Sequence, residues 1–148
     1  MATAATFTDR KPSIPRWDET FRATLAGMPA RVAAAPFGGE LLSLDWAASD
    51  RGIDYAVCIP VNNEAERLPG VLAALSRAAA RVAAQGVFVF VVNDTQDASR
   101  SLIARWAARS GAAYLLLDLT FALPARNAPH ARRLALDIAH ACAPAASA

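Results

Sequence analysis

The chain has 148 residues, and its hydrophobic fraction of 55% is enough to build the core of one folded unit. Its 15 basic and 13 acidic residues give a formal net charge of +2 and form no block of like charge, so electrostatic binding to nucleic acid or to a membrane is not expected. The longest apolar runs, such as Val87 to Val92, are too short to span a bilayer, and the first residues lack the apolar segment of a signal peptide. We therefore expect a cytoplasmic protein, with membership of a membrane-associated complex left open.

Residues 1–52 differ in pattern from the rest, because four prolines and the Gly38-Gly39 pair interrupt them. Trp17, Phe21 and Leu25 fall on one helical face, and four large apolar residues form a second group at Leu41, Leu42, Leu44 and Trp46. We expect residues 1–52 to be an irregular arm with short helices, packed on a domain that covers residues 53–148.

From residue 55 onward, short apolar runs alternate with longer helical patterns, which is typical of parallel β-α-β units. Residues 55–61 predict the first strand, and residues 64–85 predict a helix whose first turn is loosened by Pro69-Gly70 and which Gly86 ends. Residues 87–92 are apolar throughout, as expected for a central strand covered on both faces.

The second half of the pattern repeats this order. A helix that follows Asp97 places Trp106 in the core and ends at Gly111, and residues 114–119 predict the third strand. Pro129 suits the first turn of a third helix that continues to Cys142. We therefore predict an α/β fold with a three-layered, Rossmann-like parallel sheet of about three right-handed β-α units, preceded by the irregular arm.

Polar residues follow the first two strands, where open parallel sheets bind ligands. The loops at 62–66 and 93–97 contain no glycine, so the sequence has neither a dinucleotide-binding turn nor a phosphate-binding P-loop there. A carboxylate at Asp94 could accept a hydrogen bond from uracil or guanine, and the Asn93 amide could both donate and accept. A structural interpretation stays open, in which Asn62, Asn63 and Glu64 cap the first helix and Asp97 caps the second.

Two motifs carry a resemblance to a known family. Residues 57–64, VCIPVNNE, are similar to the strand and PxxNE segment that opens family 2 glycosyltransferases. Residues 91–99, VVNDTQDAS, resemble the VVDDGSTDxS segment of that family in a form one residue shorter, and residues 124–135 look like the segment that leads into its third helix. The resemblance covers about residues 55–143 and implies a partial GT-A fold.

This resemblance implies a site for a nucleotide-diphosphate sugar. Pro60, Val61 and Glu64 would line the base and the ribose, and Asn93 or Asp94 would read the base.

Three arginines near the start of the third helix are candidates for binding the diphosphate, where the helix dipole favours an anion. They are Arg126, Arg132 and Arg133, and a solvated helix face is the alternative interpretation for all three.

The family resemblance also implies parts that this sequence lacks. The family uses a D-x-D motif to hold Mn²⁺ or Mg²⁺ on the diphosphate and a later carboxylate as general base. No D-x-D follows Arg133, and Asp118 stands alone in the third strand, so we assign no metal ligand and no catalytic residue.

We expect the chain as given to be truncated before the metal motif and to lack useful transferase activity. The alternative is a non-catalytic domain that binds a nucleotide or a partner and that self-associates through an exposed sheet edge.

Cysteine and histidine positions add no metal site. Cys58 and Cys142 have no metal-ligand spacing and are expected to be reduced thiols. His130 and His140 lie ten residues apart and do not share a helical face.

Overall fold

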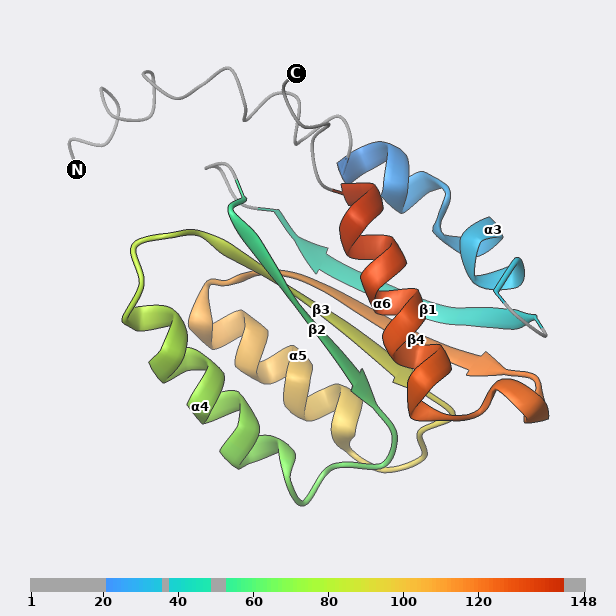
Figure 1. Cartoon of the computed structure of the whole chain (residues 1–148). Helices are drawn as coiled ribbons and strands as arrows, with labels where there is room; N and C mark the ends of the chain where they lie inside the picture. Colours follow the sequence, from blue (N-terminus) through green and yellow to red (C-terminus); the bar gives the residue numbers. More distant parts are fainter. Residues whose placement is uncertain (1–20, 36–37, 49–52, 143–148) are drawn as a thin grey trace.

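The computed structural model describes residues 21–35, 38–48 and 53–142, which form a four-stranded sheet with helices on both faces (Figure 1). Residues 21–26 are helical and precede the labelled elements. In chain order these elements are α3 (Met28–Ala33), β1 (Gly39–Ala47), β2 (Tyr55–Val61), α4 (Leu68–Ala80), β3 (Gly86–Asn93), α5 (Ser99–Ser110), β4 (Ala113–Phe121), η1 (Leu123–Ala125) and α6 (Ala128–Cys142).

The sheet has the strand order β1-β4-β3-β2, in which β2, β3 and β4 are parallel. β1 pairs antiparallel with β4. The predicted α/β class and the three predicted parallel strands are confirmed, and the arrangement is compatible with a Rossmann-like fold. The sheet is mixed, however, rather than purely parallel.

The fourth strand comes from residues that the sequence analysis placed in the arm. Leu41 and Leu44 pack on the core, and Trp46 contacts the ring of Phe21 edge to face at 5.3 Å. A bulge between Leu41 and Ser43 shifts the register, which breaks the alternation that would have marked a strand. Trp17 lies outside the described residues.

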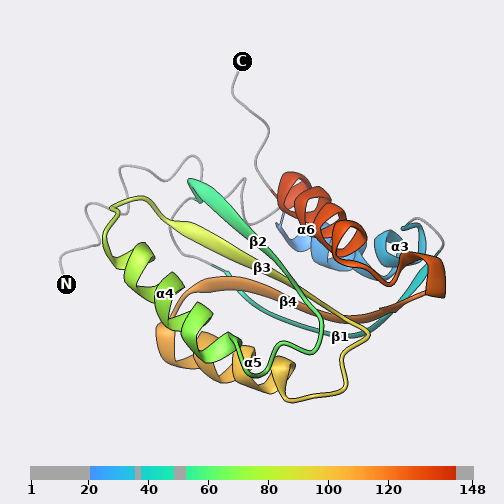
Figure 2. The ribbon, with the colours of Figure 1, turned by 60° about the horizontal axis from the view of Figure 1, so that its bottom comes forward.

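β3 is the centre of the core, and its side chains divide between two apolar layers. Figure 2 shows the helices on the two faces of the sheet, with α3 and α6 on one face and α4 and α5 on the other. Val89 and Val91 pack with α6 and with the helical residues before β1. Phe88, Phe90 and Val92 pack with α4 and α5, where the Trp106 ring meets Phe88 and Phe90 edge to face at 5.3 and 5.8 Å. The prediction of a central strand covered on both faces is therefore confirmed.

The first predicted helix is shorter than expected at both ends. α4 begins at Leu68 because Pro69 lacks an N–H and is best tolerated in the first turn. It ends at Ala80 with Arg81 as its C-cap, so Gly86 does not end a helix but is the first residue of β3.

The end of α5 and the start of α6 follow the predictions. Gly111 adopts a left-handed conformation with φ of 69° after α5, and Pro129 is the second residue of α6. No helix among the described residues has the length and the apolar character needed to cross a bilayer.

A polar cluster ties β1 to α5. The Arg100 guanidinium donates to Asp45 at 2.7 Å and to Ser43 at 3.0 Å, and it lies 3.9 Å from the Asp118 carboxylate of β4. Burial raises the pKa of Asp118, and the charge of Arg100 opposes that rise. Asp118 therefore has a structural partner in Arg100.

Replacing Phe90 with alanine tests the double-sided core. Phe90 is fully buried, so Phe90→Ala should lower the free energy of unfolding by about 3–5 kcal/mol. Leu123→Ala is the matched control, because Leu123 is 75% exposed and its loss should change stability by less than about 0.5 kcal/mol. Urea unfolding of both variants measures the difference, and equal losses would contradict the described core.

Candidate functional site

The loops that follow β2 and β3 lie side by side at the carboxyl end of the parallel strands, which we call the carboxyl edge. The two strands are parallel and in register from Tyr55 opposite Gly86 to Val61 opposite Val92, so their carboxyl ends coincide. This is the edge at which open α/β sheets bind ligands. The polar residues of both predicted motifs therefore come together as expected.

Asn62 and Asn63 fasten the first loop to the second. The Asn62 side chain donates to the backbone oxygens of Asn93 at 2.8 Å and Asp94 at 3.2 Å. The Asn63 side-chain oxygen accepts from the backbone N–H of Gln96 at 2.8 Å and of Asp97 at 3.3 Å. Both asparagines thus make their bonds across the gap between the loops, and the interpretation that they cap the first helix is wrong.

Backbone N–H groups of the first loop complete this connection. Asn63 N donates to the Thr95 hydroxyl at 3.2 Å, Glu64 N to the Ser99 hydroxyl at 2.9 Å, and Ala65 N to the Asp97 carboxylate at 3.1 Å. We call this set of bonds between residues 62–65 and 93–99 the loop latch. Three successive N–H groups are occupied by it, so they do not form an anion-binding nest.

Asp97 organises the start of α5 from just outside the helix. Its carboxylate accepts from Ser99 N at 2.9 Å and from the Ser99 hydroxyl at 2.6 Å. The residue at the cap position is Ala98, one residue later than predicted, and it makes no side-chain cap bond. The Ser99 hydroxyl bond, followed by backbone bonds from Ser99 and Ala65, lowers the pKa of Asp97 against a smaller opposing effect of burial.

Asp94 lies at the expected edge, but its carboxylate is engaged within the protein. It accepts from Phe121 N at 3.3 Å and from the Asn93 side chain at 3.2 Å, and it forms an ion pair with Arg126 Nε at 3.1 Å. The Asp94 side chain is 11% exposed, whereas that of Arg126 is 46% exposed. Arg126 also donates to Phe121 O at 2.9 Å and so covers Asp94 from the solvent side.

The remaining predicted residues at this edge differ in accessibility. Asn93 and Val61 are each only 2% exposed, so their side chains do not reach the surface. Pro60 is partly buried within β2. The Glu64 side chain is 40% exposed and lies 3.7 Å from the exposed Arg67, which is too open a pair to hold the carboxylate firmly. Glu64 is therefore the one predicted site carboxylate at this edge that stays accessible.

The three candidate arginines do not act together. Arg126 contacts Asp94, while Arg132 is exposed on α6. Arg133 lines a hollow between α3 and α6 that includes Arg31 and none of the loop residues. The structure therefore separates Arg133 from the other five predicted site residues, because its position on α6 directs it to α3.

The divalent metal implied by the family resemblance stays a prediction. No group of three or more His, Cys, Asp and Glu placed to hold an ion occurs in residues 21–35, 38–48 and 53–142. Cys58 and Cys142 are free thiols, and burial raises the pKa of each. We assign no chemical step to a metal.

A hollow at the opposite end of the sheet is a poor alternative site for a diphosphate. It has a volume of about 420 Å³ and lies at Tyr55, Gly86 and Trp106, near the amino ends of the parallel strands. None of the residues lining it is charged, so it offers no cation to an anionic ligand.

Comparison with known proteins adds no assignment: no family model matches the chain, and no curated protein or solved structure matches it either.

Two latch residues, Thr95 and Ser99, were not predicted as functional positions. Ser99 is fully buried, and its hydroxyl joins Glu64 N to the Asp97 carboxylate. Their place inside the second motif was the only signal in the sequence, because the bonds they make to the first loop span more than 30 residues.

The backbone conformation of Asn63 within the latch can be tested, because it is left-handed with φ of 49°. Asn63→Gly removes the side-chain bonds but tolerates this conformation, whereas Asn63→Ala removes the bonds and adds backbone strain. Asn63→Ala should therefore unfold at a lower urea concentration than Asn63→Gly. Its free energy of unfolding should be lower by about 1 kcal/mol. Equal stability of the two variants would show that residue 63 does not need the left-handed conformation.

The lowered pKa of Asp97 predicts a pH-dependent latch. Because the folded pKa lies below the ordinary value of 3.8, ionised Asp97 stabilises the fold above that value, and the contribution is lost as pH falls through the lowered folded pKa. Asp97→Asn should be less stable than the parent protein at pH 7, and the difference should shrink as the solution is acidified below the ordinary value. Urea unfolding across that range measures the difference, and a constant difference would rule out this role for the charge.

Proposed function

We propose that this chain binds the nucleoside part of a nucleotide-diphosphate sugar at the carboxyl edge of β2 and β3, as the nucleotide-binding part of a family 2 glycosyltransferase. The observation that carries the proposal is the loop latch, which brings the two family-like motifs together at this edge. A full-length form would transfer the sugar to an acceptor hydroxyl. No catalytic residue is assigned among the described residues, and the proposed location is cytoplasmic.

The chemistry of the edge supports a nucleoside more than a bare phosphate. The backbone N–H groups of Asn63, Glu64 and Ala65 already donate within the latch, so they are not available to cradle phosphate oxygens. What the edge presents instead is the accessible Glu64 carboxylate, which can accept hydrogen bonds from the two ribose hydroxyls.

Base recognition by Asp94 requires Arg126 to move. The Asp94 carboxylate can accept from the N–H of uracil or guanine only on the side that Arg126 now covers at 3.1 Å. Arg126 is half-exposed and held there by its Nε alone, so it can swing outward. In the proposed complex the displaced guanidinium pairs with the diphosphate, as arginine commonly does.

Titration calorimetry with UDP and with GDP, each with and without Mn²⁺, tests this proposal. We expect one nucleotide to bind, and we expect Glu64→Ala and Asp94→Asn each to weaken binding by about tenfold or more, which corresponds to about 1.4 kcal/mol. Glu66→Ala is the matched control, because Glu66 is exposed in the same loop and should not matter. No binding of either nucleotide, or equal affinity of all variants, would overturn the proposed site.

A non-catalytic partner-binding domain is the second candidate function, and the open edge of β2 favours it. Tyr55 N–H donates to Gln85 O on the β3 side of the strand. Because backbone groups alternate along a strand, those of Ala56, Cys58 and Pro60 point to the open side of β2. Pro60 has no N–H, which removes a donor from that edge and limits its pairing with another strand. A chain that binds neither nucleotide but sediments as a dimer would support this second function.

A further inference from the structure

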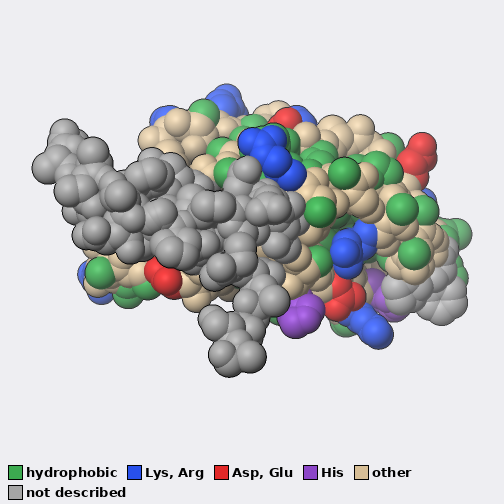
Figure 3. Space-filling model, turned by 90° about the horizontal axis from the view of Figure 1, so that it is seen from above, with side chains coloured by type: hydrophobic (Ala, Val, Ile, Leu, Met, Phe, Trp, Pro, Cys, Tyr) green, Lys and Arg blue, Asp and Glu red, His purple; other side chains and the backbone are tan. Residues whose placement is uncertain are grey.

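The hollow between α3 and α6, which we call the α3–α6 hollow, has a volume of about 570 Å³. Small residues in α3 and at its two ends, Gly27, Ala30 and Ala34, leave the space open. Four ionisable side chains line it: Arg31 from α3, and His130, Arg133 and Asp137 from α6. Viewed from above, Arg, Asp or Glu, and His side chains gather over these helices (Figure 3).

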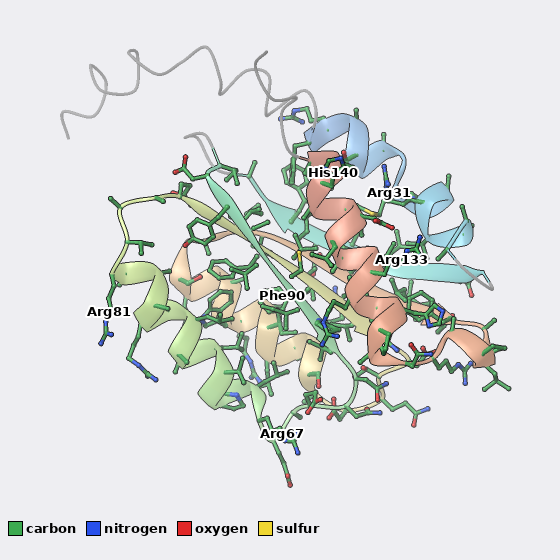
Figure 4. The ribbon with its side chains drawn as sticks, viewed as in Figure 1. Arg31, Arg67, Arg81, Phe90, Arg133 and His140 are labelled. Carbon is green, nitrogen blue, oxygen red and sulfur yellow. The ribbon has the colours of Figure 1, made fainter. Side chains whose placement is uncertain are left out.

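Arg31 has an unsatisfied donor. Its Nε is buried and has no hydrogen-bond partner among the described residues. A buried polar atom without a partner is rare in native proteins and indicates a bound water or ion. Figure 4 shows Arg31 on α3 and Arg133 on α6, at the side where the two helices face each other.

The two guanidinium groups of the hollow are both available to a ligand. In residues 21–35, 38–48 and 53–142, neither Arg31 nor Arg133 has an ion pair or a side-chain hydrogen bond. Two arginines that approach one space from two helices suit a tetrahedral oxyanion, since each guanidinium can donate two parallel bonds to it.

Asp137 adds selectivity to this arrangement. An ionised carboxylate only accepts hydrogen bonds, so it repels an anion that has no proton to donate. Inorganic phosphate retains one P–OH group near neutral pH and can donate it to Asp137, whereas sulfate has none. The same three side chains therefore favour phosphate over sulfate.

We propose that the α3–α6 hollow is a binding site for inorganic phosphate, with Arg31 and Arg133 as the donors and Asp137 as the acceptor of the phosphate proton. The site is separate from the loop latch, because none of its lining residues belongs to residues 62–65 or 93–99. It therefore stands whether or not the chain binds a nucleotide.

The test is calorimetric titration of the whole chain with sodium phosphate and with sodium sulfate at pH 7 and matched ionic strength. We expect phosphate to bind at least about tenfold more tightly than sulfate, and Arg133→Ala to weaken phosphate binding by at least about tenfold. Arg133 is exposed, so its loss should not unfold the chain. Arg133→Lys, which retains the charge but not the paired donors, should weaken phosphate binding less than Arg133→Ala.

Two further variants decide between a built site and general attraction of anions. Arg81→Ala is the matched control, because Arg81 is an exposed arginine at the end of α4, on the other side of the sheet (Figure 4). It should leave phosphate binding unchanged, and Asp137→Asn should narrow the gap between phosphate and sulfate. Phosphate binding no tighter than sulfate binding, or equal losses in Arg81→Ala and Arg133→Ala, would overturn the proposal. Glu64→Ala should bind phosphate normally, which keeps this result independent of the nucleotide test.

Discussion

Burial of β3 on both faces is the constraint on which the rest of the fold depends. All of its residues from Gly86 to Asn93 are buried, so the strand has no face that tolerates water. Apolar layers must therefore cover the sheet on both sides, with α4 and α5 on one face and α6 and the helical residues before β1 on the other. Because β2 lies parallel and in register beside β3, the loops that follow the two strands end up together.

The loop latch shows how a motif can have a structural role before it has a binding role. Asn62, Asn63, Asp97 and Ser99 use their polar groups to bond the neighbouring loop. Such loops are fixed in place before any ligand arrives, which reduces the entropy that binding would otherwise cost. Of the side chains considered for a ligand at this edge, Glu64 and Arg126 stay accessible.

The distribution of cations separates two regions of the protein. At the carboxyl edge, Arg126 is already paired with Asp94. On the other side of α6, Arg31 and Arg133 share a hollow with Asp137. The arrangement follows from helical geometry, because Arg133 falls on the face of α6 that meets α3, whereas Arg126 precedes the helix. Arg133 is therefore close in sequence to the predicted site but lies at the α3–α6 hollow.

The amino-acid sequence by itself determined the elements whose signals are local. The apolar run of β3, the left-handed position at Gly111 and the first turn of α6 at Pro129 each depend on near neighbours, and all three are as predicted. Only the tertiary structure decided that residues 39–47 form the fourth strand, because a bulge hides the alternation and the pairing partner lies far along the chain. It also decided that Asp94 is covered by Arg126 and that Arg133 faces Arg31. Hydrogen bonds and hollows of this kind depend on which distant elements meet, and no local pattern of residues encodes that.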